Sequence, residues 1–98
     1  MKTVFETSIL HMNIAFHVEI WKEGNVFIAL ASQLGVTSCG DSMEEARQNI
    51  QDAVAGFLKG AKKLGTLEEI LEEAGFRKKK GWEPPEILSF EKIAISLA

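Results

Sequence analysis

The chain has 98 residues, of which 46% are apolar and 26% are charged, and its formal net charge is −3. This length and balance fit one soluble domain with a modest core and argue against two domains or a phosphate-dominated nucleic-acid binder. No apolar run approaches the roughly 20 residues of a membrane-spanning helix, and Met1–Thr7 lacks the pattern of a secretory signal. The single cysteine, Cys39, excludes an intramolecular disulfide. We therefore expect a cytoplasmic protein without membrane contacts.

The beginning of the chain shows no single pattern. We expect residues 1–13 to form either an N-terminal extension or an extra strand. Met12 directly precedes the first clear strand pattern and is therefore an alternative start of translation. In that case residues 1–11 would be an extension that results from assigning the start codon too early. The domain itself is predicted over residues 14–98.

Three strands are predicted in the first half of this domain. Residues Ile14–Trp21 alternate with the period of two that marks a half-buried strand. Lys22–Asn25 supplies a turn, in which Gly24 accepts a positive φ. The apolar run Val26–Ala31 is predicted as the returning arm of a hairpin, and Val36–Cys39 as a short third strand.

A long amphipathic helix is predicted next. Ser42 and Glu45 have the spacing of a capping box, in which each side chain accepts a backbone N–H at the helix start. Apolar residues recur every three or four positions in one stripe, which we expect to pack on the sheet. The stripe consists of Met43, Ala46, Ile50, Ala53, Val54, Phe57 and Leu58. Gly60 is predicted to end this helix.

A second helix is predicted after a short connection. Thr66 and Glu69 repeat the capping-box spacing, and Gly75 followed by Phe76 is typical of a Schellman stop. The basic residues that come next, Arg77–Gly81, are expected to form a loop.

The last residues predict an extended segment and a closing strand. Two prolines keep Glu83–Glu86 from being helical. A final strand is expected over Ile87–Leu97, where Ile93, Ile95 and Leu97 alternate with small residues. The predicted fold class is therefore α+β: a single domain of order β-β-β-α-α-β, with an antiparallel-rich sheet and the helices packed on one face.

One group of features occurs in a specific order and spacing between Ile14 and Leu58, which is close to half of the chain. It consists of the Glu23–Gly24 turn, the apolar run Val26–Ala31, the Leu34–Val36 step, the junction Gly40–Ala46 with the pattern Gly-Asp-Ser-x-x-Glu-Ala, and Asn49–Ile50 in the helix. In this respect the chain resembles the HicB antitoxins and the related HicB-like proteins. Each matched position also has a folding reason: Gly40 gives room at a corner, Ser42 caps the helix, and Ala46 lets the helix lie close to the sheet.

The resemblance implies a degenerate, partial RNase H-like fold with a helix across the sheet. It also implies a partner, a HicA-type toxin that cleaves mRNA through a histidine and whose active surface the antitoxin covers. Many members carry a C-terminal DNA-binding module, but after Leu58 this chain predicts one helix, a Pro-Pro segment and a strand. DNA binding is therefore in doubt. The alternative is an orphan HicB-like homo-oligomeric binding module, with or without nucleic acid, that has no toxin partner.

Catalytic chemistry of the RNase H type would need clustered carboxylates around two metal ions about 4 Å apart. The candidates are Glu19, Glu45 and Glu91, yet the predicted strands contain no aspartate and Glu45 already has a capping role. Two histidines, His11 and His17, and one cysteine are too few for a closed zinc site. We therefore predict no catalytic residue, no metal site, no cofactor and no enzymatic activity.

Partner binding is predicted to involve His17, Glu19, Trp21 and Trp82. The first three share one face of a predicted strand, and tryptophan is enriched at binding hot spots because it buries a large area with few rotatable bonds. His17 beside Glu19 could alternatively act as an oriented base, but a solvated or interface histidine is the commoner meaning. An exposed strand edge also favours self-pairing, so we expect a homo-oligomer.

Two further features have alternative interpretations. The cluster Arg77, Lys78, Lys79 and Lys80 beside Trp82 would suit nucleic-acid binding by phosphate pairing and stacking, although a solvated loop is the commoner meaning. Cys39 precedes a helix N-terminus, where a thiol can become reactive. We predict instead that Cys39 is a small buried side chain.

Overall fold

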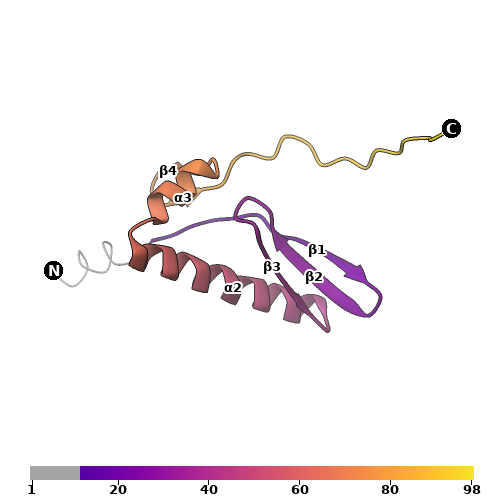
Figure 1. The fold of residues 1–98 in the computed structure, drawn as a ribbon, viewed down its shortest axis with the longest axis horizontal. Coiled ribbons are helices and arrows are strands. Elements are labelled where there is room, and N and C mark those ends of the chain that lie inside the picture. Colours follow the sequence, from indigo (N-terminus) through magenta and orange to yellow (C-terminus); the bar gives the residue numbers. More distant parts are fainter. Residues whose placement is uncertain (1–11) are drawn as a thin grey trace.

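The computed structural model describes residues 12–98 (Figure 1), so the predicted extension or strand over residues 1–11, including His11, lies outside the described residues. Three antiparallel strands, β1 (Glu19–Glu23), β2 (Val26–Ala31) and β3 (Val36–Gly40), form a sheet of order β1-β2-β3. Two helices follow, and the α+β class is confirmed. The first strand begins later than predicted, because Ile14–Val18 is extended but lies outside the paired register of β1 and β2.

The hairpin between β1 and β2 forms as predicted. Gly24 has a φ of 60° at the first of two loop residues, where the tight turns that match the twist of paired strands require a positive φ. Glu23 then faces Val26, and Trp21 faces Ile28. The turn therefore sets which side chains share a face of the sheet.

Helix α2 (Met43–Leu64) packs along one face of the sheet (Figure 1). The predicted Ser42 cap is confirmed, because Ser42 Oγ accepts from the Glu45 amide at 3.0 Å. The Glu45 carboxylate reaches back one residue beyond the cap and accepts from the Asp41 amide at 2.6 Å. Ala46 has no exposed surface, and a Cβ atom on Gly40 would lie 2.6 Å from the Ala46 nitrogen. The two small residues therefore allow close approach of helix and strand.

The predicted end of this helix at Gly60 is wrong. The helix continues to Leu64 and ends at Gly65, which has a φ of 77° and donates to the Lys62 carbonyl. Gly60 lies on the solvent side with no atom near its missing Cβ. A glycine in an exposed helix interior lowers stability without ending the helix when the neighbouring turns are packed.

The second helix, α3 (Leu67–Glu73), begins without the predicted capping box. The Thr66 hydroxyl donates instead to the Ala61 carbonyl at 3.4 Å. Because α3 follows α2 closely, this carbonyl near the end of α2 is within reach of the hydroxyl that would otherwise cap α3. The predicted Schellman stop is confirmed: Gly75 has a φ of 88°, and the Phe76 amide donates to the Leu71 carbonyl at 2.9 Å.

The predicted basic loop instead contains a short hairpin of β4 (Arg77–Lys78) and β5 (Trp82–Glu83). Trp82 also joins the start of the domain, because its amide donates to the Asn13 carbonyl at 2.7 Å and its carbonyl accepts from the Ala15 amide at 2.9 Å. The residue before it is Gly81, where a Cβ would lie 2.4 Å from the Asn13 oxygen. This parallel bridge therefore requires glycine at that position.

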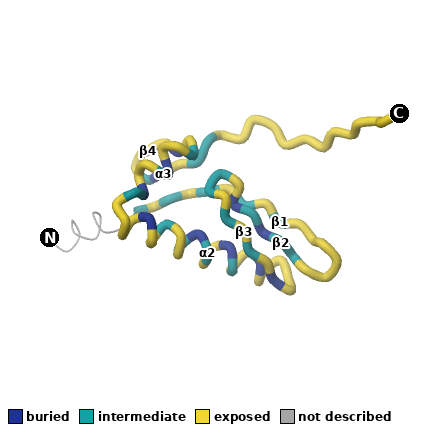
Figure 2. The backbone as a smooth tube through the Cα atoms, in the orientation of Figure 1, coloured by how far each residue is buried: buried dark blue, intermediate teal, exposed yellow. Residues whose placement is uncertain are grey.

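Two buried clusters make up the core, and residues at their boundary such as Phe16 and Leu58 touch both. The first lies between the sheet and α2: Ala29, Ala31, Ala46, Ile50 and Val54. The second joins the end of α2 to α3 and the short hairpin: Ala61, Leu67, Leu71, Phe76 and Trp82. Two members of the predicted stripe, Met43 and Phe57, are exposed instead. Figure 2 shows the buried positions of α2 recurring along the helix.

The predicted closing strand over Ile87–Leu97 is not part of either sheet. The chain leaves the domain after Pro85 and runs extended and exposed (Figure 2). The observed order is therefore β-β-β-α-α-β-β, in which the last two strands are the short hairpin. Within residues 12–98, no helix is long and apolar enough to cross a membrane.

The Gly40 corner leads to a stability prediction. A Gly40→Ala substitution should lower the free energy of unfolding by about 1–3 kcal/mol, because the added methyl would overlap backbone atoms at the start of α2. Gly56→Ala is the matched control: Gly56 is exposed within α2 with open space around it, so alanine should raise stability by about 1 kcal/mol. Urea denaturation monitored by circular dichroism measures both. Equal effects of the two substitutions would contradict the close helix–strand contact.

Candidate functional site: the open face of the sheet

Among residues 12–98, a helix covers only one face of the sheet. Side chains on the α2 side, such as Phe16, Ile20 and Phe27, pack against the first core cluster. We call the opposite surface the open face. By the alternation of the strands and their register it consists of His17, Glu19, Trp21, Glu23, Val26, Ile28, Leu30, Thr37 and Cys39. None of these residues belongs to either core cluster of the described chain.

The open face is organised in rows that cross the three strands. One row joins Trp21, Ile28 and Cys39, which are direct partners in the register. A second row joins Glu19, Leu30 and Thr37. Directly opposed residues have Cβ atoms about 4.5–5.5 Å apart, so each row is a contiguous strip of surface. The first row is apolar throughout, while the second places an apolar residue between two polar ones.

Trp21 is the largest side chain on this surface. It is 39% exposed, and its indole Nε1 donates to a carboxylate oxygen of Glu23 at 2.7 Å. Glu23 is two residues further along the strand, so both side chains project from the open face. The bond holds the indole in one orientation and leaves part of the ring in contact with solvent.

The charges on the open face are mainly acidic. Glu19 and Glu23 both project from it, and His17 precedes them on the same side by alternation. The nearby Lys22 belongs to the other side of the strand, where its Nζ lies 5.4 Å from the ring centroid of Phe27. An apolar strip with carboxylates beside it is a surface suited to a protein partner that carries positive charge.

Three of the four residues predicted for partner binding, His17, Glu19 and Trp21, lie together on this face and are exposed. Trp82 does not join them. It is 3% exposed in the second core cluster, and its indole Nε1 is buried without a hydrogen-bond partner. Its backbone bonds to Asn13 and Ala15 and its side chain packs in the core, so Trp82 serves the packing of the domain.

The burial of Trp82 also changes the interpretation of the basic cluster. Lys78 has its Nζ 5.8 Å from the Trp82 ring centroid and 3.7 Å from a Glu68 carboxylate oxygen. Arg77, Lys79 and Lys80 are exposed on the short hairpin. The cluster is therefore an exposed positive hairpin without the accessible aromatic ring that base stacking needs.

The candidate carboxylates for metal chemistry lie on separate parts of the molecule. Glu19 is on the open face, Glu45 caps α2, and Glu91 lies beyond Pro85, where it accepts from the Ser89 hydroxyl. In the part of the chain that the structure describes, no three His, Cys, Asp or Glu side chains come together to hold a metal ion. Cys39 was predicted to be buried, but it is exposed, because its strand places it on the open face.

The middle of the open face was not identified from the sequence. Ile28 and Leu30 belong to the predicted strand Val26–Ala31, whose continuous apolar run does not distinguish its two faces. The signal was the lack of alternation in Val26–Ala31, since a strand that is apolar on both faces belongs in a sheet covered on both sides. Helix α2 covers one side here, and no other element of residues 12–98 covers the second apolar face.

The different exposure of the two tryptophans predicts a spectroscopic result. Trp21→Phe should remove the quenchable part of the fluorescence, because Trp82 lies in the core. The remaining emission should shift to shorter wavelength, and the acrylamide quenching constant should fall severalfold. A variant whose remaining tryptophan is quenched as strongly as the unchanged protein would contradict the burial of Trp82.

The open face is thus defined by the geometry of this chain. Comparisons of the chain with protein-family models, curated proteins and solved structures gave no match.

Proposed function

We propose that the chain is a HicB-like binding protein whose open face covers the RNA-cleaving surface of a HicA-type toxin. The observation that carries this proposal is the apolar row Trp21–Ile28–Cys39, which no element of the described chain covers and which carboxylates flank. The role is occlusion of a partner, so the chain itself needs no catalytic group.

The apolar row supplies the binding energy in this proposal. Trp21 is partly exposed and already oriented by its bond to Glu23, so little conformational freedom is lost when a partner covers the ring. Ile28 and Leu30 are the apolar neighbours on the central strand. A central aromatic anchor with a polar rim is the usual arrangement of a binding hot spot.

The carboxylates supply selectivity for the proposed partner. A surface that binds RNA carries positive charge, because it must neutralise phosphates. Glu19 and Glu23 present negative charge beside the apolar row, and complementary charges speed association and disfavour acidic partners. The same carboxylates argue against RNA itself as the ligand of this face.

The resemblance to HicB antitoxins is the second support. Its sharpest element, Gly40–Ala46, is a tight corner at which α2 starts across the sheet. Three antiparallel strands with one helix across them are compatible with a partial RNase H-like fold, which we include in the proposal. Cytoplasmic location is part of the same proposal, since a toxin that cleaves mRNA acts where mRNA is translated.

The proposal predicts a specific loss of binding. In pull-down and calorimetry with a HicA-type toxin, Trp21→Ala should weaken the complex by about 2 kcal/mol or more, roughly thirtyfold. Phe57→Ala is the matched control, because Phe57 is 38% exposed and Trp21 is 39% exposed, but Phe57 lies on α2. The control should bind like the unchanged protein.

A growth assay gives an independent readout of the same variants. Co-expression of the chain should rescue cells from the toxin, and rescue should be lost with Trp21→Ala while circular dichroism reports an unchanged fold. Failure of the unchanged chain to bind or rescue would reject the toxin as partner. Binding that survives Trp21→Ala but not Phe57→Ala would reject the open face.

A further inference from the structure

The segment Ile87–Ala98, which we call the tail, exposes an unusual amount of apolar surface. Its six large apolar side chains are each between 52% and 92% exposed. They are Ile87, Leu88, Phe90, Ile93, Ile95 and Leu97. Soluble monomers rarely leave so large a contiguous apolar surface in water, and such a surface marks an interaction site. The tail is also extended and has no strand partner in the described chain, so its backbone groups are free to join a sheet.

Two prolines direct the tail away from its own domain. A residue that precedes proline is restricted to extended conformations, so Glu83 and Pro84 continue in a straight path. Pro85 lies close to Gly75, just after the end of α3, since a Cβ placed on Gly75 would be 3.0 Å from the Pro85 Cγ. Beyond Pro85 the tail projects past the body of the domain (Figure 1).

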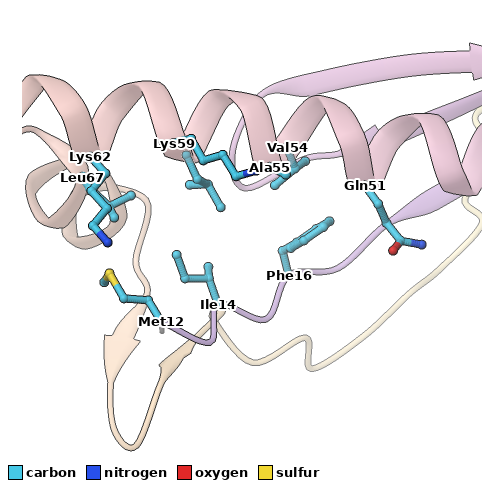
Figure 3. Close-up of a pocket in the computed structure, with 10 residues that line it drawn as sticks. Met12, Ile14, Phe16, Gln51, Val54, Ala55, Lys59, Lys62 and Leu67 are labelled. Atoms are coloured by element: carbon cyan, nitrogen blue, oxygen red, sulfur yellow. The ribbon is translucent and has the colours of Figure 1, made fainter. Parts of the chain in front are cut away.

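A largely apolar groove lies between α2 and the segment Met12–Ile20 in the part of the chain that the structure describes. It consists of two adjoining hollows of about 430 and 590 Å³, and both are lined by Ile14 and Phe16. In Figure 3, side chains of this segment face those of α2 across the first hollow. The second hollow continues beside β1 along Val18 and Ile20 to the exposed Met43.

The backbone beside this groove is also available. β1 pairs with β2 on one side, and β1 is an edge strand of the sheet. Just before β1, the Trp82 bridge occupies the Asn13 carbonyl and the Ala15 amide. Within the described chain, the outer edge of Glu19–Glu23 has no strand partner. A strand added here would also lie over the groove.

We propose that the tail of a second copy of this chain adds as a strand to the outer edge of β1, and that the two copies exchange tails symmetrically. Ile93, Ile95 and Leu97 share one side of an extended chain and would enter the groove against α2. Ala94 and Ser96 share the other side and would extend the open face with small residues. The tail thereby gives the expected homo-oligomer a specific interface.

The tail pattern fits the two sides of this site. The groove suits large apolar side chains, because its lining is mainly apolar and includes Phe16, Val18 and Ile50. Polar side chains of α2, such as Arg47 and Lys59, also line it. The row of Trp21 remains uncovered, so the dimer is independent of the proposed toxin complex. A second copy is the occupant because the prolines carry each tail away from its own groove, and a twofold exchange buries both tails at once.

Mass measurement by size-exclusion chromatography with light scattering tests the exchange. The unchanged chain should have twice the protomer mass of 10.8 kDa. Ile95→Glu should reduce this to the protomer mass, because it would place a carboxylate in the apolar groove. Ser96→Glu is the matched control on the opposite side of the tail, and it should remain a dimer.

Three results would overturn the proposal. The first is a single-protomer mass for the unchanged chain at all concentrations; protection of the tail amides from hydrogen exchange in that state would assign the groove to the chain's own tail. The second is a dimer that survives Ile95→Glu. The third is equal loss of the dimer with Ser96→Glu. Trp21→Ala should leave the dimer intact, so failure of toxin binding and failure of tail exchange are distinguishable.

Discussion

The close contact between the end of β3 and the start of α2 is the constraint on which the rest of the fold depends. Position 40 has no room for a side chain, because a Cβ on Gly40 would lie 2.6 Å from the Ala46 nitrogen. The Asn49 side-chain Nδ2 then donates to the Cys39 carbonyl at 2.8 Å, which adds a polar bond between helix and strand. With this corner set, α2 lies along one face of the sheet and buries Ile50 and Val54.

Within residues 12–98, the three-stranded sheet has one covering helix, and two of its surfaces have no partner. The first is the open face, where Ile28 and Leu30 point away from α2. The second is the edge of β1 with its groove along the helix. Backbone groups and apolar side chains are available at the edge, whereas the open face offers side chains alone. The two surfaces therefore favour different occupants, a strand at the edge and a folded protein on the face.

Local sequence patterns predicted a feature correctly where the residues that produce it lie within a few positions of one another. The Gly24 turn, the Ser42 cap and the Gly75 stop were all predicted, because each depends on residues within a few positions. The prediction of a helix end at Gly60 failed, because packing of the next turn at Ala61 outweighs the low helix propensity of glycine. The prediction of a capping box at Thr66 is wrong, because the Thr66 hydroxyl donates to the Ala61 carbonyl near the end of α2.

The sequence by itself determined the α+β class, the hairpin, the strand–helix corner and the shared face of His17, Glu19 and Trp21, since periodicity decides which side chains point the same way. Only the tertiary structure decided which of two apolar surfaces is buried. It placed Trp82 in the core, exposed Cys39, and left the predicted last strand without a partner among residues 12–98. Burial depends on contacts between residues far apart in the chain, and an extended apolar segment carries no local signal of which sheet it joins.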